Sequence, residues 1–342
     1  MPYQTRKLLI ITFIWGYLLI IAAIPVLASG DDTSWSFDIG YSYFHVREDL
    51  PGMVQDQLES ENDLVKLGIN YSTGLLNGQL NLGVEGKGPE DDFEVKLKEL
   101  AWSGNTGKIL YEAGKTKWIW GRGLSYIPTC PLDKDTYYWG LQGSLININN
   151  NLSIGAVSSK DSYYSNDYDS EILPVDGSDE YYTGWIRAGW IFETSDITTV
   201  VSYQSGQDIW NYGFDFSRDL LNGFEIHGGF NYKKPDSNTQ YLIGCQYSGK
   251  FFYMMEYYHE TDDQLVFSFS NSADMFGKWQ WELREIYDLS DNGEIRQLNI
   301  SYIKNNNFVP ELKVSMNTGP QNSYFQQNSF DYSIYFGVKS KF

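Results

Sequence analysis

The last thirteen residues of the chain alternate between apolar and polar side chains. The apolar residues stand at every second position, with Ser340 as the interruption: Phe330, Tyr332, Ile334, Phe336, Val338 and Phe342. A period of two belongs to a β-strand, because successive side chains of a strand point to opposite faces. The pattern therefore predicts a final strand with one apolar face and one wet face.

The N-terminus has the three parts of a secretory signal peptide. Arg6 and Lys7 precede a long apolar run, and residues 26–28 provide a plausible cleavage site. We expect residues 1–28 to be this signal and residues 31–342 to form one domain. An uncleaved membrane anchor is the alternative, because the run is long for a signal. No later run approaches the roughly 18 apolar residues that a helical span requires.

A final strand that ends on an aromatic residue resembles the C-terminal signal of bacterial outer-membrane barrels. The resemblance implies a place in the outer membrane of a Gram-negative bacterium, among lipid and lipopolysaccharide. It also implies that the barrel-assembly machinery recognises the strand that ends in Phe342.

Alternating segments separated by turns fill the rest of the chain, without a linker or a low-complexity tract. Eighteen segments are candidate strands: 35–43, 65–71, 80–84, 93–102, 109–120, 141–148, 152–157, 182–192, 197–203, 210–216, 224–232, 241–247, 251–259, 265–269, 279–287, 295–302, 312–316 and 330–342. A membrane protein without spanning helices satisfies its backbone only as a closed barrel. We therefore expect an all-β, antiparallel, up-and-down transmembrane barrel of 16 to 18 strands, since several segments are short.

Composition agrees with that expectation and excludes one class of partner. Aromatic residues make up 17 % of the chain, and many stand where strands should meet the membrane interface, as in a girdle. The net charge of −19 argues against nucleic acid, which requires basic patches. The two cysteines, Cys130 in a loop and Cys245 in a strand, predict no disulfide framework and no metal site.

Residues 114–135 differ from the rest of the chain. Lys115 and Lys117 lead into Trp118 and Trp120, and the strand breaks at Gly121-Arg122-Gly123. The lysines share the parity of apolar residues, although a lysine that faces lipid costs roughly 2–4 kcal/mol at the midplane. We favour a bulge near Gly114 that turns Trp118 and Trp120 outward; lysines beyond the hydrocarbon band are the alternative.

The same segment resembles a group of bacterial outer-membrane porin-like proteins and, more loosely, alginate-export-like barrels. They share a Gly-Lys strand, a Trp-Gly-(Lys/Arg)-Gly turn and a loop with Pro and Asp. The matching residues are Gly114, Lys115, Trp120, Gly121, Arg122, Gly123, Pro128, Pro131 and Asp133. The match covers about a fifteenth of the chain, and it implies a channel or transport role without naming a solute.

This segment could form a constriction inside the barrel. Lys115, Lys117 and Arg122 would then offer positive charge to an anionic or sugar-like solute, because charged groups set pore selectivity. A turn that braces the wall, with Arg122 paired to an acid, is equally compatible, and both hypotheses place Arg122 inside. We expect an inward loop at residues 121–139 or at residues 161–180.

Further charged residues stand at positions that should face the interior of the barrel. They are Lys96, Lys98, Glu112, Arg187, Glu256, Glu282 and Arg284. They are candidates for the pore lining, and cross-strand ion pairs that stiffen the wall are the alternative.

The function that these patterns favour is passive diffusion of small hydrophilic solutes through an outer-membrane porin. A barrel that sheaths a periplasmic or surface partner, for secretion or electron transfer, is the alternative. An outer-membrane hydrolase is a further one, with His227 near Glu225 as a base. No catalytic motif appears, so we expect neither enzymatic activity nor a cofactor. The solute and the oligomeric state have no signal in the sequence.

Overall fold

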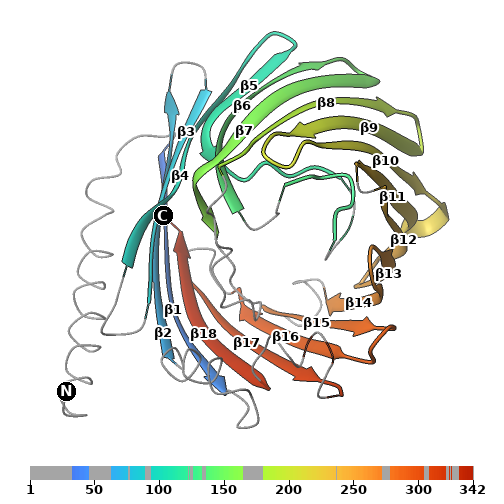
Figure 1. The fold of residues 1–342 in the computed structure, drawn as a ribbon. Helices are drawn as coiled ribbons and strands as arrows, with labels where there is room; N and C mark the ends of the chain where they lie inside the picture. The colour runs from blue at the N-terminus through green and yellow to red at the C-terminus, as the bar shows by residue number, and fades with distance from the viewer. Residues whose placement is uncertain are drawn as a thin grey trace.

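The chain forms one antiparallel sheet of eighteen strands that closes into a barrel. Closure is visible in the pairing of β1 (Thr33–His45) with both β2 (Asp63–Leu75) and β18 (Tyr332–Lys341). Figure 1 shows the strands following one another around the wall in chain order. The expected fold class is therefore confirmed, with the larger of the two expected strand numbers.

The computed structural model describes most of the chain. The described residues are 33–45, 63–75, 78–88, 94–121, 123, 126–132, 136–164, 180–235, 237–271, 278–303, 308–320, 323, 325 and 331–341. The expected signal at residues 1–28, the terminal Phe342 and the candidate pore residue Arg122 lie outside them. Among the described residues, no helix is long and apolar enough to span a membrane.

Each of the eighteen expected segments overlaps one observed strand. The remaining strands are β3 (Gly78–Gly88), β4 (Glu94–Thr106), β5 (Ile109–Thr116), β6 (Thr136–Ile146), β7 (Asn150–Tyr164), β8 (Tyr182–Ile191), β9 (Ser195–Gln204), β10 (Ile209–Asp219), β11 (Phe224–Lys234), β12 (Asn238–Ser248), β13 (Phe251–His259), β14 (Asp263–Asn271), β15 (Trp279–Asp288), β16 (Glu294–Tyr302) and β17 (Val309–Thr318). A short 3-10 helix, Leu221–Gly223, joins β10 to β11.

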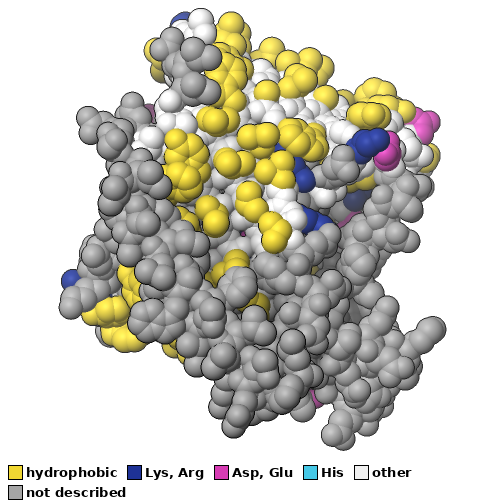
Figure 2. Space-filling model, turned by 90° about the vertical axis from the view of Figure 1, so that its left-hand side faces the viewer, with side chains coloured by type: hydrophobic (Ala, Val, Ile, Leu, Met, Phe, Trp, Pro, Cys, Tyr) yellow, Lys and Arg dark blue, Asp and Glu magenta, His cyan; other side chains and the backbone are white. Residues whose placement is uncertain are grey.

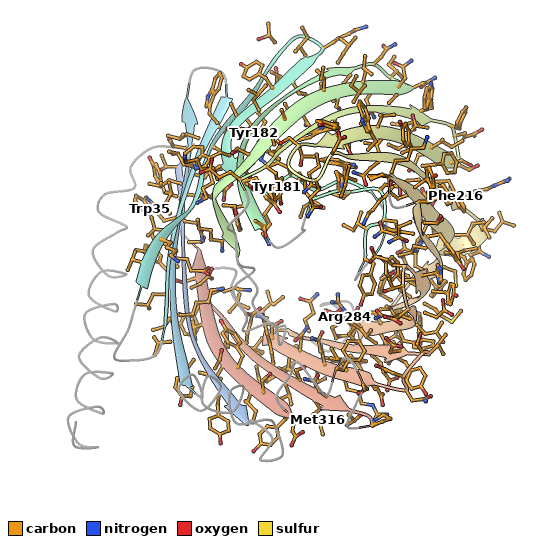
Figure 3. The ribbon with its side chains drawn as sticks, in the orientation of Figure 1. Trp35, Tyr181, Tyr182, Phe216, Arg284 and Met316 are labelled. Atoms are coloured by element: carbon orange, nitrogen blue, oxygen red, sulfur yellow. The ribbon has the colours of Figure 1, made fainter. Side chains whose placement is uncertain are left out.

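The two faces of the sheet differ as the alternation requires. Large apolar side chains such as Leu141 and Ile154 are exposed on the outer face, and Figure 2 shows such side chains on one side of the barrel. Polar side chains line the inner face; Ser144 and Ser153, for example, are buried and hydrogen-bonded to each other at 2.8 Å. Figure 3 shows Phe216 and Met316 on the outside and Arg284 pointing inward.

The four longest connections lie at one end of the barrel. Because consecutive strands are antiparallel, the β1–β2, β5–β6, β7–β8 and β17–β18 connections fall at the same end, which we call the loop end. The first and last described strand residues lie at the other end, the turn end. In outer-membrane barrels the longer loops are extracellular.

Candidate pore constriction

The segment after β5 leaves the wall and enters the barrel (Figure 1). We call residues 117–132 the inner loop. Its Thr129 donates a hydrogen bond to Asp215 on the inner face of β10, and Pro128 lies beside Gly229 of β11. Tyr126 reaches as far as Tyr258 of β13. The first of the two expected inward loops, residues 121–139, is thus confirmed for its described residues up to 132, whereas residues 136–139 belong to β6 in the wall. Residues 165–179 of the second expected loop lie outside the described residues.

An apolar cluster fixes the beginning of the inner loop to the wall. Trp118, Trp120 and Leu132 pack on inner-face residues of β6–β9: Tyr138, Val157, Trp185 and Val200. The indole N–H of Trp118 donates to the Tyr138 carbonyl at 2.9 Å, and that of Trp120 donates to the Thr129 carbonyl at 3.2 Å. Buried indoles with satisfied N–H groups are stable anchors.

The expected outward direction of Trp118 and Trp120 is therefore wrong. They are 3 % and 6 % exposed, and both rings contact Trp185 inside the barrel. The expected bulge near Gly114 is also absent, because the described ladders of β5 with β4 and β6 keep their register through that residue. The physical reason is that β5 ends at Thr116, so the alternation of the strand does not extend to the two tryptophans.

A polar contact fixes the middle of the inner loop. The Thr129 hydroxyl donates to Asp215 Oδ2 at 2.6 Å, and both side chains are buried. The Arg187 guanidinium carbon stands 6.0 Å from the centre of the Trp120 ring, within the range of a cation–π contact. Cys130 lies in the same layer, where burial raises the pKa of its thiol to about 11.

A second apolar cluster holds the tip of the loop against the far wall. The Tyr126 ring stacks on Tyr258 with centroids 4.1 Å apart and planes 5° apart. Tyr126 also packs against a cluster of buried residues: Val266, Ile286, Ile295 and Phe325. Because Phe325 belongs to the β17–β18 connection, two connections from the loop end meet inside the barrel. The inner loop is thus anchored along its described length.

Lysines gather where the inner loop leaves the wall. We call Lys66, Lys96, Lys98 and Lys117 the lysine side. Lys66 and Lys98 share the buried carboxylate of Glu85, at 3.2 and 3.1 Å. The ammonium groups of Lys98 and Lys117 lie 5.5 and 5.2 Å from the centre of the Tyr137 ring. Lys96 lies opposite Glu85 in the ladder of β3 with β4, so the predicted pore residues Lys96, Lys98 and Lys117 are brought together.

The register places the other predicted charges on the inner face. Glu112 lies opposite Gln142 in the ladder of β5 with β6. Glu256 Oε1 lies 3.0 Å from Nε2 of the buried His227. Glu282 and Arg284 are neighbours, with Oε1 and Nη2 3.8 Å apart. Lys115 is the exception: it lies opposite Leu100 and Trp139, on the face of the apolar residues, but its side chain is buried.

Sequence reasoning missed some members of the site. Lys66 and Glu85 were not selected, although Lys66 alternates with Val65 and Leu67 in an expected strand. That alternation is the signal that could have identified it. Among the described residues, no group of three His, Cys, Asp or Glu side chains is placed to hold a metal ion.

Solved structures with the same architecture are outer-membrane channels. The barrel is similar to Pseudomonas aeruginosa OccD3 (OpdP), with 11 % identity, a TM-score of 0.60 and coverage of 92 % of this chain and 91 % of that one. For Acinetobacter baumannii OccAB1 the identity is 9 % and the TM-score is 0.61, with coverage of 91 % of this chain and 96 % of that one. For Pseudomonas aeruginosa OpdK, solved with vanillate, the identity is 10 % and the TM-score is 0.62, with coverage of 91 % of this chain and 98 % of that one.

No protein-family model matches the chain, and no curated protein matches it. At identities of 9 to 11 %, the similar structures establish the fold. The solute has to be argued from this chain's own residues.

Proposed function

We propose that the chain is an outer-membrane channel through which small hydrophilic solutes diffuse passively. The observation that carries this proposal is the inner loop, anchored inside a closed barrel by Trp120, Thr129 and Tyr126. Barrels of 16 to 18 strands leave room for an aqueous channel. An anchored loop narrows such a channel to a constriction that selects solutes by size and charge.

The lysine side supports a preference for solutes that carry an anionic group. Lys98 and Lys117 flank the Tyr137 ring, so a carboxylate could contact an ammonium group while an apolar or sugar face packs on the ring. The similar channel OpdK was solved with vanillate, a small aromatic carboxylate, which supports a solute of this size.

The alternative functions have less support from the geometry. A sheath for a protein partner needs a wide, empty interior, whereas the inner loop and Phe325 occupy part of this one. A hydrolase needs a nucleophile beside its base, but the contacts of the His227 ring run to Glu225 and Glu256. We therefore propose a channel without enzymatic activity, embedded in lipopolysaccharide and assembled through the strand that ends in Phe342.

Single-channel conductance of the refolded mature chain in a planar bilayer tests the proposal. We expect stable ohmic steps, and a reversal potential in a KCl gradient that moves toward cation preference in Lys98→Gln/Lys117→Gln. Lys234→Gln removes a lysine from the outer face of β11 and should leave the reversal potential unchanged. A correctly folded barrel that passes no current would overturn the channel function.

A further inference from the structure

Three charged residues on the outer face of the barrel form a group that we call the charged cluster. Glu285 of β15 lies opposite Arg296 of β16 in the ladder, and Glu294 stands two residues before Arg296. The outward side of β15 is otherwise apolar or aromatic, as at Trp281 and Leu283. Arg296 Nε contacts Glu285 Oε1 at 2.8 Å and Glu294 Oε1 at 2.5 Å.

The charged cluster lies at a depth where the outer face of a lone barrel meets hydrocarbon. Trp279 and Tyr302 pair at the turn end with ring centroids 4.9 Å apart, as in an aromatic girdle. From Trp279 to Glu285 the strand rises about 15 Å along the membrane normal, at about 3.3 Å per residue and a tilt of about 40°. Because the apolar band of such barrels is about 25 Å tall, the cluster falls inside it, in the half nearer the loop end. Charges at that depth are costly unless a polar group of a protein meets them.

The charged cluster keeps hydrogen-bonding capacity that its own residues do not use. Both carboxylates contact the Nε atom of Arg296, and within the described chain neither of its Nη nitrogens has a partner. The Arg296 side chain is 55 % exposed and that of Glu285 is 38 % exposed. A guanidinium carries five N–H donors in a fixed fork, so it can hold a further carboxylate. The cluster thus offers both a donor and an acceptor to a partner.

A two-fold axis along the membrane normal makes the charged cluster complementary to itself. Such an axis keeps every residue at its own depth, so the cluster of one copy meets the same cluster of a second copy. In a contact of this kind, residue i touches residue j and residue j touches residue i. The Nη nitrogens of Arg296 can then reach the partner's Glu285 on both sides of the axis.

An apolar groove begins at Glu285 and runs across the strands. It has a volume of about 280 Å³, and Glu285 is the one charged residue among its described lining residues. One wall follows a single ladder row, in which Cys245, Met255, Phe267 and Glu285 lie opposite one another in turn. The other wall is the next row of outward side chains: Tyr253, Phe269 and Leu283. The groove is therefore perpendicular to its own strands.

The direction of the groove is close to that in which the strands of a second barrel would run. Strands tilt by about 40° from the barrel axis, so the facing strands of two barrels with parallel axes cross at about 80°. A groove perpendicular to its own strands then lies within about 10° of the facing strands. The outward side chains along one facing strand form a ridge that fits such a groove.

We propose that the charged cluster and the groove are the contact between two copies of this chain, related by a two-fold axis along the membrane normal. The Nη nitrogens of Arg296 bind Glu285 of the partner subunit, and a strand ridge of each copy fills the groove of the other. The contact removes from hydrocarbon the charges that lipid cannot pair. It is independent of conduction, since it faces away from the lumen.

Sedimentation equilibrium of the refolded mature chain in density-matched detergent micelles tests the contact. We expect a monomer–dimer equilibrium for the wild type. Met255→Trp fills the groove with a larger apolar side chain, and it should raise the dissociation constant of the dimer about tenfold or more. Ile154→Trp is the matched control, because Ile154 is an exposed apolar residue on the outer face of β7, away from the groove. It should dimerise as the wild type does.

A second pair of variants tests the charged cluster separately. Arg296→Leu leaves the partner's Glu285 without its donor and should also raise the dissociation constant, whereas Arg218→Leu removes an exposed arginine at the turn end of β10 and should not. Arg296→Lys keeps the charge without the fork, and its dissociation constant should fall between those of the wild type and Arg296→Leu. A wild type that stays monomeric at every protein concentration, or that forms a trimer, would overturn the proposal. Folded, heat-modifiable Met255→Trp that dimerises as Ile154→Trp does would overturn it too.

Discussion

The hydrogen bond between Thr129 and Asp215 ties the inner loop to the wall, and the effect of removing it can be calculated. A buried hydroxyl donates there to a buried carboxylate over 2.6 Å. Hydrogen bonds to charged groups contribute roughly 1.5–3 kcal/mol. Thr129→Val removes the donor and keeps the shape of the side chain. The population of undocked loop should therefore rise about 10- to 150-fold, since about 1.4 kcal/mol corresponds to a factor of ten.

Alkylation of Cys130 reports that population directly. The thiol lies within the docked loop, where its burial raises its pKa to about 11. Its side chain is partly exposed in the docked loop, but the thiol is protonated there at pH 8, so iodoacetamide reacts with it faster when the loop undocks. Measured in a Cys245→Ser background, the alkylation rate of Thr129→Val should exceed that of the parent by up to the same factor.

Thr183→Val provides the control for this experiment. Thr183 is also a buried threonine of the inner wall, and its hydroxyl makes no hydrogen bond within the described structure. Its substitution should leave the alkylation rate of Cys130 unchanged. A rate for folded Thr129→Val within twofold of that for Thr183→Val would refute the role of the hydrogen bond.

Three further outcomes are expected from the site. Trp185→Ala removes the inner-wall ring under both loop tryptophans and should weaken docking by about 3–5 kcal/mol, seen as larger, noisier single-channel currents. Cys130 alkylation in the parent should keep rising with pH toward about 11, because the thiolate reacts and the raised pKa delays its formation; a plateau near pH 9 would contradict this. Glu85→Gln leaves Lys66 and Lys98 without their shared carboxylate, so reversal potentials should move toward anion preference.

The wall of the barrel could be predicted from the sequence because each strand lies between two different environments. In β18, Ile334, Phe336 and Val338 share one face, and the same rule located the inward charges of β15. The rule fails where a strand ends. Trp118 and Trp120 continue the alternation in sequence, but they come after Thr116, where the backbone turns into the lumen.

The contacts that anchor the inner loop had no local signal. Thr129 and Asp215 are 86 residues apart, and nothing in either neighbourhood indicates the other. Val157, Trp185 and Val200 form an apolar patch on a face that is polar in most channels, so their burial could not be inferred from periodicity. The candidate loop could be selected for its glycines and tryptophans, whereas its docking surface needed the fold.

The pairing of β1 with β18 has a consequence for how the chain reaches its folded state. Ser36 lies opposite Lys341, about three hundred positions later, so this seam forms after every other strand has been made. Until then two strand edges stay open, and open edges pair readily with other chains. Contacts between such distant parts of a chain also form slowly. Closure of the barrel therefore competes with aggregation during assembly. The outcome depends on what covers the open edge of β1 until β18 pairs with it.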